Sequence, residues 1–208
     1  MKSHDFLLEL GTEELPPKLL LSLSNSLKDN LSHELNKLNI SYNIIKAFAT
    51  PRRLAISVSE LQSKQQDQVI EKKGPSTQSP ETAINGFANS CGVLVDELEK
   101  KELGGKEYFF YSKEEPGENI KDLLPVIIEK SIKDIPITRA MKWGDSEYSF
   151  VRPVHWLVLM LDKDIVNANI MGLESGRVSR GLRFQEVSLN FSHANEYEQT
   201  MKDKAQIL

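Results

Sequence analysis

The hydrophobic pattern of the chain opens with an apolar run at residues 6–10 that a Gly-Thr pair closes, as expected for a short strand. Leucines then recur at spacings of three and four residues: Leu20, Leu23, Leu27, Leu31, Leu35 and Leu38. This spacing predicts one apolar stripe on a helix of about six turns. Two prolines, Pro16 and Pro17, suit the first turn of that helix, where amide hydrogens have no partner.

Alternation of apolar and polar positions predicts two strands next, at residues 42–49 and 53–59, on either side of Thr50-Pro51-Arg52. The pattern then indicates a loop or strand extension at 62–68, a turn at 72–76, short helices at 81–90 and 94–101, and a strand at 107–111. Gly92 stands between the two short helices, in a position that suits a left-handed helix cap.

A second amphipathic helix is predicted by the apolar spacing from Ile120 to Ile132, and Pro136 lies beyond its end. From Tyr148 onward we expect strands at 154–161 and 165–171, a glycine- and arginine-rich connection at 172–185, and a final helix from 193 or 194 to 206. Strands and helices mix without regular βαβ spacing, so the predicted class is α+β. It would comprise an N-terminal strand–helix–hairpin unit, a small helical insert and a mixed β-rich region. The expected boundary separates residues 1–138 from residues 139–208.

The composition is that of an ordinary globular protein, with 208 residues, 39% hydrophobic and 27% charged side chains. A single cysteine, Cys91, excludes an internal disulfide and a cysteine-rich zinc site. No apolar run approaches the roughly 20 residues of a membrane-spanning helix, and the N-terminus meets charge too early for a secretory signal. We therefore expect a cytoplasmic protein with no membrane contact.

The net charge of −4 conceals an uneven distribution of arginine. Five of the seven arginines lie between Arg139 and Arg183, where seven basic and five acidic side chains sum to +2. Residues 1–138 sum to −4 and residues 184–208 to −2. This concentration of arginine indicates an anionic partner.

Catalytic signatures are not recognisable in the sequence. The four histidines lack metal-ligand spacing, and no phosphate-binding loop or nucleophile elbow occurs. We therefore assign no catalytic residue and no metal site. The adjacent Glu13 and Glu14 are interpreted as charges at a helix N-terminus, and Cys91 as a small buried hydrophobe. His33 is expected at the surface, and His155 is expected to be hydrogen-bonded and half-buried.

The basic residues form the sharpest candidate site, because guanidinium groups bind phosphate through paired hydrogen bonds and the neighbouring aromatic rings can stack on bases. The candidates for phosphate contact are Arg52, Arg53, Arg139, Lys142, Arg152, Arg177, Arg180 and Arg183. The alternative is that these cations form salt bridges with some of the 30 carboxylates.

Seven sequence blocks resemble, in order, those of the β subunit of bacterial heterotetrameric glycyl-tRNA synthetase. They are LELGTEELPP (8–17), FATPRRLA (48–55), EKKGP (71–75), GFANSCG (86–92), MKWG (141–144), FVRPVH (150–155) and RVSRGLRF (177–184). The resemblance implies an N-terminal portion of a subunit of an α2β2 ligase that joins glycine to tRNA(Gly). ATP and Mg²⁺ would bind at the partner α subunit, which carries the catalysis, and no cofactor would bind to this chain.

The family's β subunit is longer, and continues into an HD-type domain and an anticodon-binding domain. From about Met141 the resemblance implies a region similar to the B3/B4 fold of the phenylalanyl-tRNA synthetase β subunit, which hosts an editing site in that relative. No hydrolytic residue can be assigned to it here. Three roles stay open: a tRNA-contacting scaffold, a purely architectural interface module, and hydrolysis of mischarged tRNA.

Overall fold

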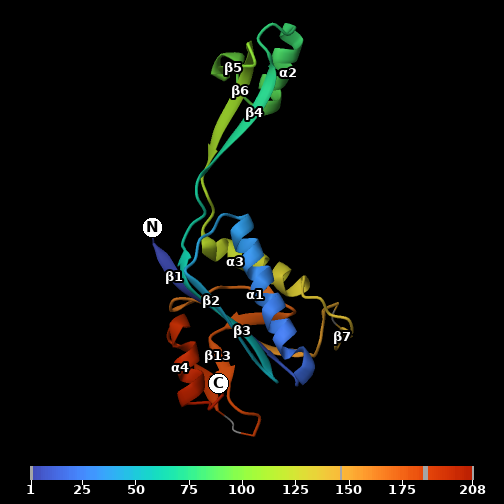
Figure 1. Ribbon diagram of the computed structural model, residues 1–208, viewed down its shortest axis with the longest axis vertical. Helices are drawn as coiled ribbons and strands as arrows, with labels where there is room; N and C mark the ends of the chain where they lie inside the picture. Colours follow the sequence, from blue (N-terminus) through green and yellow to red (C-terminus); the bar gives the residue numbers. More distant parts are fainter. Residues whose placement is uncertain (1, 146, 185–186, 208) are drawn as a thin grey trace. The chain divides into compact units, whose positions relative to one another are not determined.

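The computed structural model describes residues 2–145, 147–184 and 187–207 (Figure 1). The chain divides into two compact units. The larger unit contains residues 1–65 and 118–208, and the smaller contains residues 66–117. The smaller unit is therefore an insertion within the chain of the larger one.

The larger unit is built on a sheet with the strand order β11-β12-β9-β1-β3-β2. Its centre is β1 (Ser3–Thr12), which pairs antiparallel with β3 (Arg53–Gln62) and with β9 (Val154–Leu161). β2 (Ile44–Thr50) forms a hairpin with β3 through a turn at Pro51 and Arg52. The four strands predicted in these segments are confirmed, and the regions expected before and after residue 138 share one sheet.

The edge beyond β9 consists of short strands. β10 (Asp164–Ile165) pairs with β9, while β12 (Leu173–Gly176) runs parallel to β9 and pairs with β11 (Asn169–Ile170). The prediction of a single strand at 165–171 is wrong. The Ser175 hydroxyl donates to the backbone oxygen of residue 166 and accepts from the backbone N–H of residue 168. These backbone groups therefore pair with a side chain and not with a neighbouring strand, which interrupts the ladder there.

One face of this sheet is covered by α1 (Leu20–Lys37) and α3 (Ile120–Lys133) (Figure 1). A 3₁₀ turn, η1 (Pro17–Leu19), leads into α1, as the prolines suggest. Side chains at positions 6, 8 and 10 of β1 pack into this core, together with four leucines of the predicted stripe: Leu23, Leu27, Leu31 and Leu35. Both amphipathic helices are therefore confirmed, because burying their apolar stripes on the sheet stabilises them.

The opposite face carries a second core under β13 (Val178–Arg180), β14 (Ser188–Asn190), η3 (Ala194–Glu196) and α4 (Tyr197–Asp203). Because side chains alternate along a strand, Leu7 and its odd-numbered neighbours on β1 face this side. Figure 1 shows α4 on the side of the sheet away from α1. The final helix is confirmed, although it ends at Asp203.

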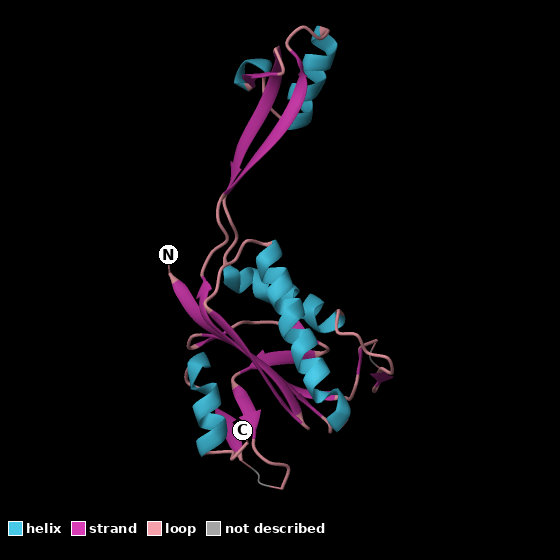
Figure 2. Cartoon of the chain, in the orientation of Figure 1, coloured by secondary structure: helices cyan, strands magenta, loops and turns pink. Residues whose placement is uncertain are grey.

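The inserted unit combines strands in the order β4-β6-β5 with one helix (Figure 2). The strands are β4 (Gln68–Ser76), β5 (Glu99–Leu103) and β6 (Lys106–Glu115), and the helix is α2 (Glu81–Cys91). Gly92 caps α2 with φ of +73°, as predicted. The strand predicted at 107–111 is confirmed as part of β6.

Two local predictions in this unit are wrong. The helix expected at 94–101 is a 3₁₀ turn, η2 (Val95–Glu97), followed by β5, whose side chains are mostly charged and whose backbone pairs with β6. The turn expected at 72–76 continues β4, with an irregularity in register between Lys73 and Ser76. Gly74 lies in this irregular stretch, where a Cβ atom would stand 2.5 Å from the Phe87 ring, so close packing against α2 explains this glycine.

Two very short strands, β7 (Met141–Lys142) and β8 (Ser149–Phe150), pair in the segment between α3 and β9. Mixed sheets and helices of this kind confirm the α+β class. None of the helices in the described part of the chain is long and apolar enough to cross a membrane.

Candidate nucleic-acid interface

The turn between β2 and β3 sends two adjacent arginines in different directions. Arg53 is 2% exposed; its Nη1 donates to Oε2 of Glu9 at 3.4 Å and its Nη2 donates to the backbone oxygen of Arg180 at 2.8 Å. Arg52 is half-buried, and its guanidinium carbon lies 6.0 Å from the centroid of the Trp156 ring. The salt-bridge alternative therefore holds for Arg53, whose guanidinium is not at the surface where a phosphate would bind.

The carboxylate of Glu9 is the centre of a buried polar cluster on β1. Its exposure is 0%, and it accepts hydrogen bonds from Trp156 Nε1 at 2.5 Å, from the Tyr197 hydroxyl at 2.5 Å and from the Ser179 hydroxyl. Together with Arg53, these donors satisfy a charge that would be costly to bury alone. Burial, and then the negative charge of Glu9, raises the pKa of Tyr197 well above its ordinary value of 10.0.

No pattern in the sequence predicts the Glu9 cluster. Its four donors are 44, 147, 170 and 188 residues away along the chain, and they belong to β3, β9, β13 and α4. The available signal is a carboxylate between Leu8 and Leu10 in an apolar strand, because such a group requires buried donors. The cluster joins the sheet to the layer that carries β13 and α4.

A pocket of about 490 Å³ lies against Trp156 and brings three of the eight candidate cations together. Its described lining comprises Arg52, Trp156, Val178, Arg180, Gly181, Leu182, Arg183, Val187 and Ser188. The guanidinium carbon of Arg180 is 5.1 Å from the Trp156 ring centroid, within the range of a cation–π contact. No carboxylate occurs among these described lining residues, so we call this pocket the arginine pocket.

Glu13 and Glu14 connect β1 to the cations beside the arginine pocket. Arg183 Nη1 donates to Glu14 Oε1 at 3.0 Å, and Arg152 Nε donates to the Glu14 backbone oxygen at 3.2 Å. Glu13 Oε1 lies 3.0 Å from Nε2 of His155, whose side chain is hydrogen-bonded, as expected, and 38% exposed. The helix-end interpretation of the two glutamates is wrong, because they precede η1 and bond these partners instead.

The other three candidate cations do not line the arginine pocket. Arg139 is exposed between α3 and β7, and Lys142 of β7 forms an exposed ion pair with Glu147 at 3.2 Å. Arg177, between β12 and β13, donates to the backbone oxygen of Lys163 at 2.9 Å. The eight candidates therefore occupy several environments and do not form one cluster.

Asp5, Asp162 and His193 place possible metal-ligand atoms within 4.8 Å of one another. Nδ1 of His193 accepts a hydrogen bond from the backbone N–H of Asn195 at 3.3 Å, so the proton of the neutral ring is on Nε2, which faces Asp162 at 3.8 Å. A nitrogen that binds a metal must be unprotonated. His4 also bonds Asp162, at 2.6 Å, so the arrangement favours a hydrogen-bonded cluster over a metal site.

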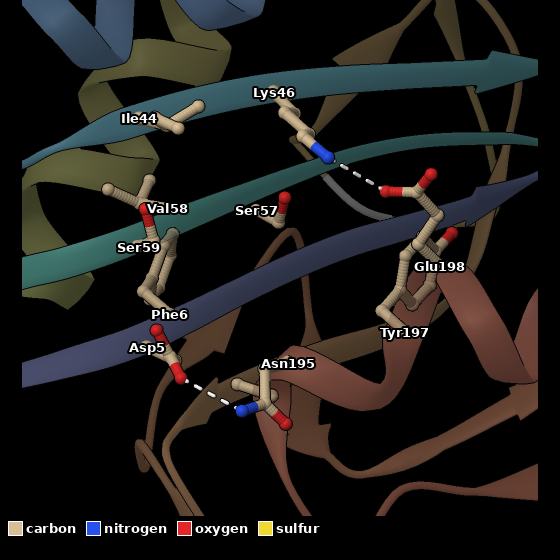
Figure 3. A pocket seen from close by; sticks show the side chains of 11 residues that line it. Asp5, Phe6, Ile44, Lys46, Ser57, Val58, Ser59, Asn195, Tyr197 and Glu198 are labelled. Carbon is tan, nitrogen blue, oxygen red and sulfur yellow. Dashed lines mark hydrogen bonds and ion pairs between the residues drawn. The ribbon is translucent and has the colours of Figure 1, made fainter.

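A smaller hollow of about 220 Å³ lies between the sheet and the C-terminal helices (Figure 3). Figure 3 shows Lys46 of β2 reaching Glu198 of α4, at 3.0 Å, and Asp5 of β1 accepting from Asn195, also at 3.0 Å. Hydrogen bonds from Lys46 and then from Lys202 lower the pKa of Glu198. These two interactions across the hollow thus hold η3 and α4 on the sheet.

Cys91 is half-buried at the end of α2, 3.9 Å from the Ser90 hydroxyl, so the expectation of a buried hydrophobe is wrong. The helix ends there, which leaves its last residue at the margin of a small core. His33 is exposed on α1, as expected.

Comparison with known proteins assigns the chain to a family. The family model described as the glycyl-tRNA synthetase beta subunit matches residues 6–208. The chain belongs to this family. The matched range includes Glu9, Arg53 and Ser179, whose side chains meet in one buried cluster.

Several relatives carry the name glycine–tRNA ligase beta subunit. The protein of Coxiella burnetii is 44% identical over 191 residues, which cover 88% of this chain and 28% of the relative. Those of Cronobacter sakazakii and Erwinia tasmaniensis are 37% and 39% identical, over all of this chain and 31% of each relative. The chain thus spans less than a third of the length of these relatives.

Proposed function

We propose that this chain is the N-terminal part of a glycine–tRNA ligase β subunit and contributes tRNA-contacting surface and scaffold to the ATP-dependent attachment of glycine to tRNA(Gly). The relatives' shared name supports a ligase subunit. In this proposal the assembly is a cytoplasmic α2β2 tetramer. The α subunit holds ATP and Mg²⁺ and carries out the chemistry.

The observation that carries the RNA-contact proposal is the set of cations that no described carboxylate neutralises. Arg52 and Arg180 lie against Trp156, while Arg152 and Arg177 bond only backbone oxygens and a thioether; Arg139 is exposed. Guanidinium groups that no carboxylate neutralises remain able to bind phosphate. Arg183 and Lys142 are in exposed ion pairs, which are weak and leave them available to a polyanion. Arg53 is not part of this set.

The test is the salt dependence of tRNA(Gly) binding to the 208-residue chain. If four or five cations contact phosphates, the logarithm of affinity falls with the logarithm of salt concentration at a slope of about −3 to −5. An affinity that does not change with salt, or no binding at low salt, contradicts the proposal.

An architectural role without RNA contact is the second candidate, favoured by the two-sided burial of the sheet and by the ion pairs of Arg183 and Lys142. Charge reversal at Arg177, Arg180 and Arg183 separates the two roles. Loss of tRNA binding with an intact α-subunit complex supports RNA contact, while loss of the complex supports the architectural role.

A matched control for this charge reversal is available on the other face of the sheet. Lys18, Lys121 and Lys133 belong to η1 and α3, and all three are exposed. Reversing their charges changes the net charge by the same amount. Equal losses of tRNA affinity in both triple variants would show that binding follows net charge and not this surface.

A further inference from the structure

The charge distribution at the arginine pocket leaves positive charge uncompensated. Three guanidinium carbons lie 6.0, 5.8 and 5.1 Å from the centroid of one indole ring, that of Trp156; they belong to Arg52, Arg53 and Arg180. Glu9 neutralises Arg53, which is buried. No described carboxylate pairs with Arg52 or Arg180, so the lining of the pocket holds two cations that an anion would stabilise.

Arg52 also carries an unused hydrogen-bond donor. Its Nε atom is buried and has no partner in the described part of the chain. Buried donors are almost always bonded in folded proteins, since leaving one unbonded costs free energy. Arg52 lines the pocket, so a bound acceptor that reached this group would remove the cost. The pocket is thus suited to a ligand with several acceptor oxygens.

The wall beyond the arginines is apolar. Val178 and Leu182 line the pocket and remain 46% and 43% exposed, so part of the wall offers uncovered aliphatic surface. Trp156 is only 8% exposed, which leaves little of its ring for a base to stack on. A ligand that fills the pocket would therefore place its charge on the arginines and a flat or apolar group on the aliphatic wall.

We infer that the arginine pocket binds one unpaired nucleotide of an RNA strand. Its phosphate lies against Arg52 and Arg180, and its base packs on Val178 and Leu182. The pocket volume, about 490 Å³, is within the range of roughly 300–1,000 Å³ that small-ligand sites occupy. This inference rests on the proposed RNA-contacting function and names the form of RNA that the surface recognises.

Unpaired RNA fits these features better than two other polyanions. In a duplex the bases are stacked inside the helix, so a duplex would offer phosphates to the arginines but nothing to the aliphatic wall. In an acidic protein segment, the residue that carries the carboxylate has no flat apolar group of its own. An unpaired nucleotide carries phosphate and an accessible base together.

Tryptophan fluorescence reports on the pocket directly. The chain has two tryptophans, so Trp143→Phe makes Trp156 the sole reporter. We would titrate this 208-residue variant with a short single-stranded RNA, an RNA duplex of equal length, adenosine monophosphate, inorganic phosphate and polyglutamate. The single strand is expected to perturb Trp156 at the lowest concentration, followed by adenosine monophosphate.

Substitution then assigns the signal to the pocket. Arg52→Gln and Arg180→Gln, each in the reporter background, are expected to weaken single-strand binding by about ten- to a hundredfold, the loss of one charge-assisted interaction. Lys121→Gln on α3 removes the same charge elsewhere and is expected to leave the Trp156 response unchanged. Circular dichroism of each variant shows whether it folds. Leu182→Asp, at an exposed position, tests the apolar wall separately.

Each remaining outcome decides against the inference in a distinguishable way. Suppose that tRNA(Gly) binds with the expected salt slope, but that Trp156 fluorescence does not change and Arg52→Gln and Arg180→Gln do not weaken binding. The pocket inference then fails and the proposed function stands. If no RNA binds, both fail. An equal response to duplex or to inorganic phosphate overturns the unpaired-nucleotide form, and a stronger response to polyglutamate assigns the pocket to an acidic protein segment.

Discussion

The carboxylate of Glu9 and the guanidinium of Arg53 lie 3.4 Å apart in the interior of the larger unit, with 0% and 3% of their side chains exposed. Glu9 is on the central strand, and Arg53 begins the neighbouring strand. The pair therefore sits where the sheet, β13 and α4 meet. Removing either charge leaves the other buried without its partner.

Replacing one member of this pair is expected to be severe. Glu9→Gln keeps the volume of the side chain but leaves Arg53 uncompensated, which should lower the free energy of unfolding by about 3–5 kcal/mol. Urea denaturation of the 208-residue chain measures this loss. The double variant Glu9→Gln with Arg53→Met should lose less than the sum of the two single variants, because no isolated charge remains.

The exposed pair Lys142 and Glu147 provides the control for this prediction. Its side chains are 64% and 94% exposed, so Lys142→Gln should not measurably change stability. Additive losses in the Glu9 and Arg53 double variant would contradict the coupling that the structure indicates.

A glycine on β1 makes room for Trp156. Gly11 lies opposite Trp156 in the β1–β9 register, and a Cβ atom at Gly11 would stand 1.8 Å from Cε2 of the indole. The ring cannot move aside easily because it is buried and bonded to Glu9. Gly11→Ala should therefore destabilise the fold by at least about 1–3 kcal/mol, measured by thermal denaturation.

Gly176 is the matched control for the Gly11 substitution. It lies on β12, paired with β9 in the same sheet, and the nearest atom to an added Cβ is 3.9 Å away. Gly176→Ala should leave the melting temperature close to that of the parent chain. If both alanine variants melt alike, close packing on Trp156 is not the reason for the glycine.

The local elements of the larger unit were predictable because short-range spacing determines them. The leucine repeat of α1 and the alternation in β3 each recur within a few residues, and burial on the sheet then confirms them. The helix expected at 94–101 failed for a different reason. A short run rich in charge has no strong period, and pairing with β6, which is a tertiary contact, decided its structure.

The candidate site was predictable only in part. Arg52 and Arg53 are equivalent in the sequence, yet Arg53, the first residue of β3, is buried against Glu9, while Arg52, in the turn before it, lines the pocket. Their surroundings come from Ser179, Arg180 and Trp156, more than 100 residues away. The sequence therefore indicates which residue types bind an anion, while the direction of each side chain depends on long-range pairing.

Tyr197 should remain protonated in alkaline solution for as long as the chain is folded. Burial and the charge of Glu9 raise its pKa, so the fold favours the protonated form. The stability that this contributes is complete below the ordinary value of 10.0 and is lost as pH rises through the higher folded value. Ultraviolet absorbance of tyrosinate, followed together with circular dichroism, should show one tyrosine ionising only as the fold is lost.

The variant Tyr197→Phe assigns that late step. It removes the hydroxyl and should abolish the absorbance change that coincides with unfolding, whereas Tyr148→Phe, at a position that is 39% exposed, should leave it in place. A late step that survives in Tyr197→Phe would mean that another tyrosine produces it.

Asp162, in the turn between β9 and β10, should make the free energy of unfolding depend on pH in the acid range. Partial burial alone would raise the pKa of Asp162, but the hydrogen bonds from His4 and from the backbone N–H of Asp5 outweigh it, and the pKa falls below its ordinary value of 3.8. The ionised carboxylate therefore stabilises the fold at pH values above 3.8, and this contribution is lost as pH falls through the lower folded pKa.

Asp162→Asn tests this dependence without disturbing the turn. Residue 162 has φ of +52°, a left-handed conformation that asparagine also tolerates. The variant should be less stable than the parent chain at about pH 7 and should lose less stability between about pH 5 and pH 3, measured by urea denaturation. Asp164→Asn, an exposed carboxylate in the same hairpin, is the control and should follow the parent curve. Parallel curves for the parent and Asp162→Asn would show that this carboxylate ionises alike in the folded and unfolded chain.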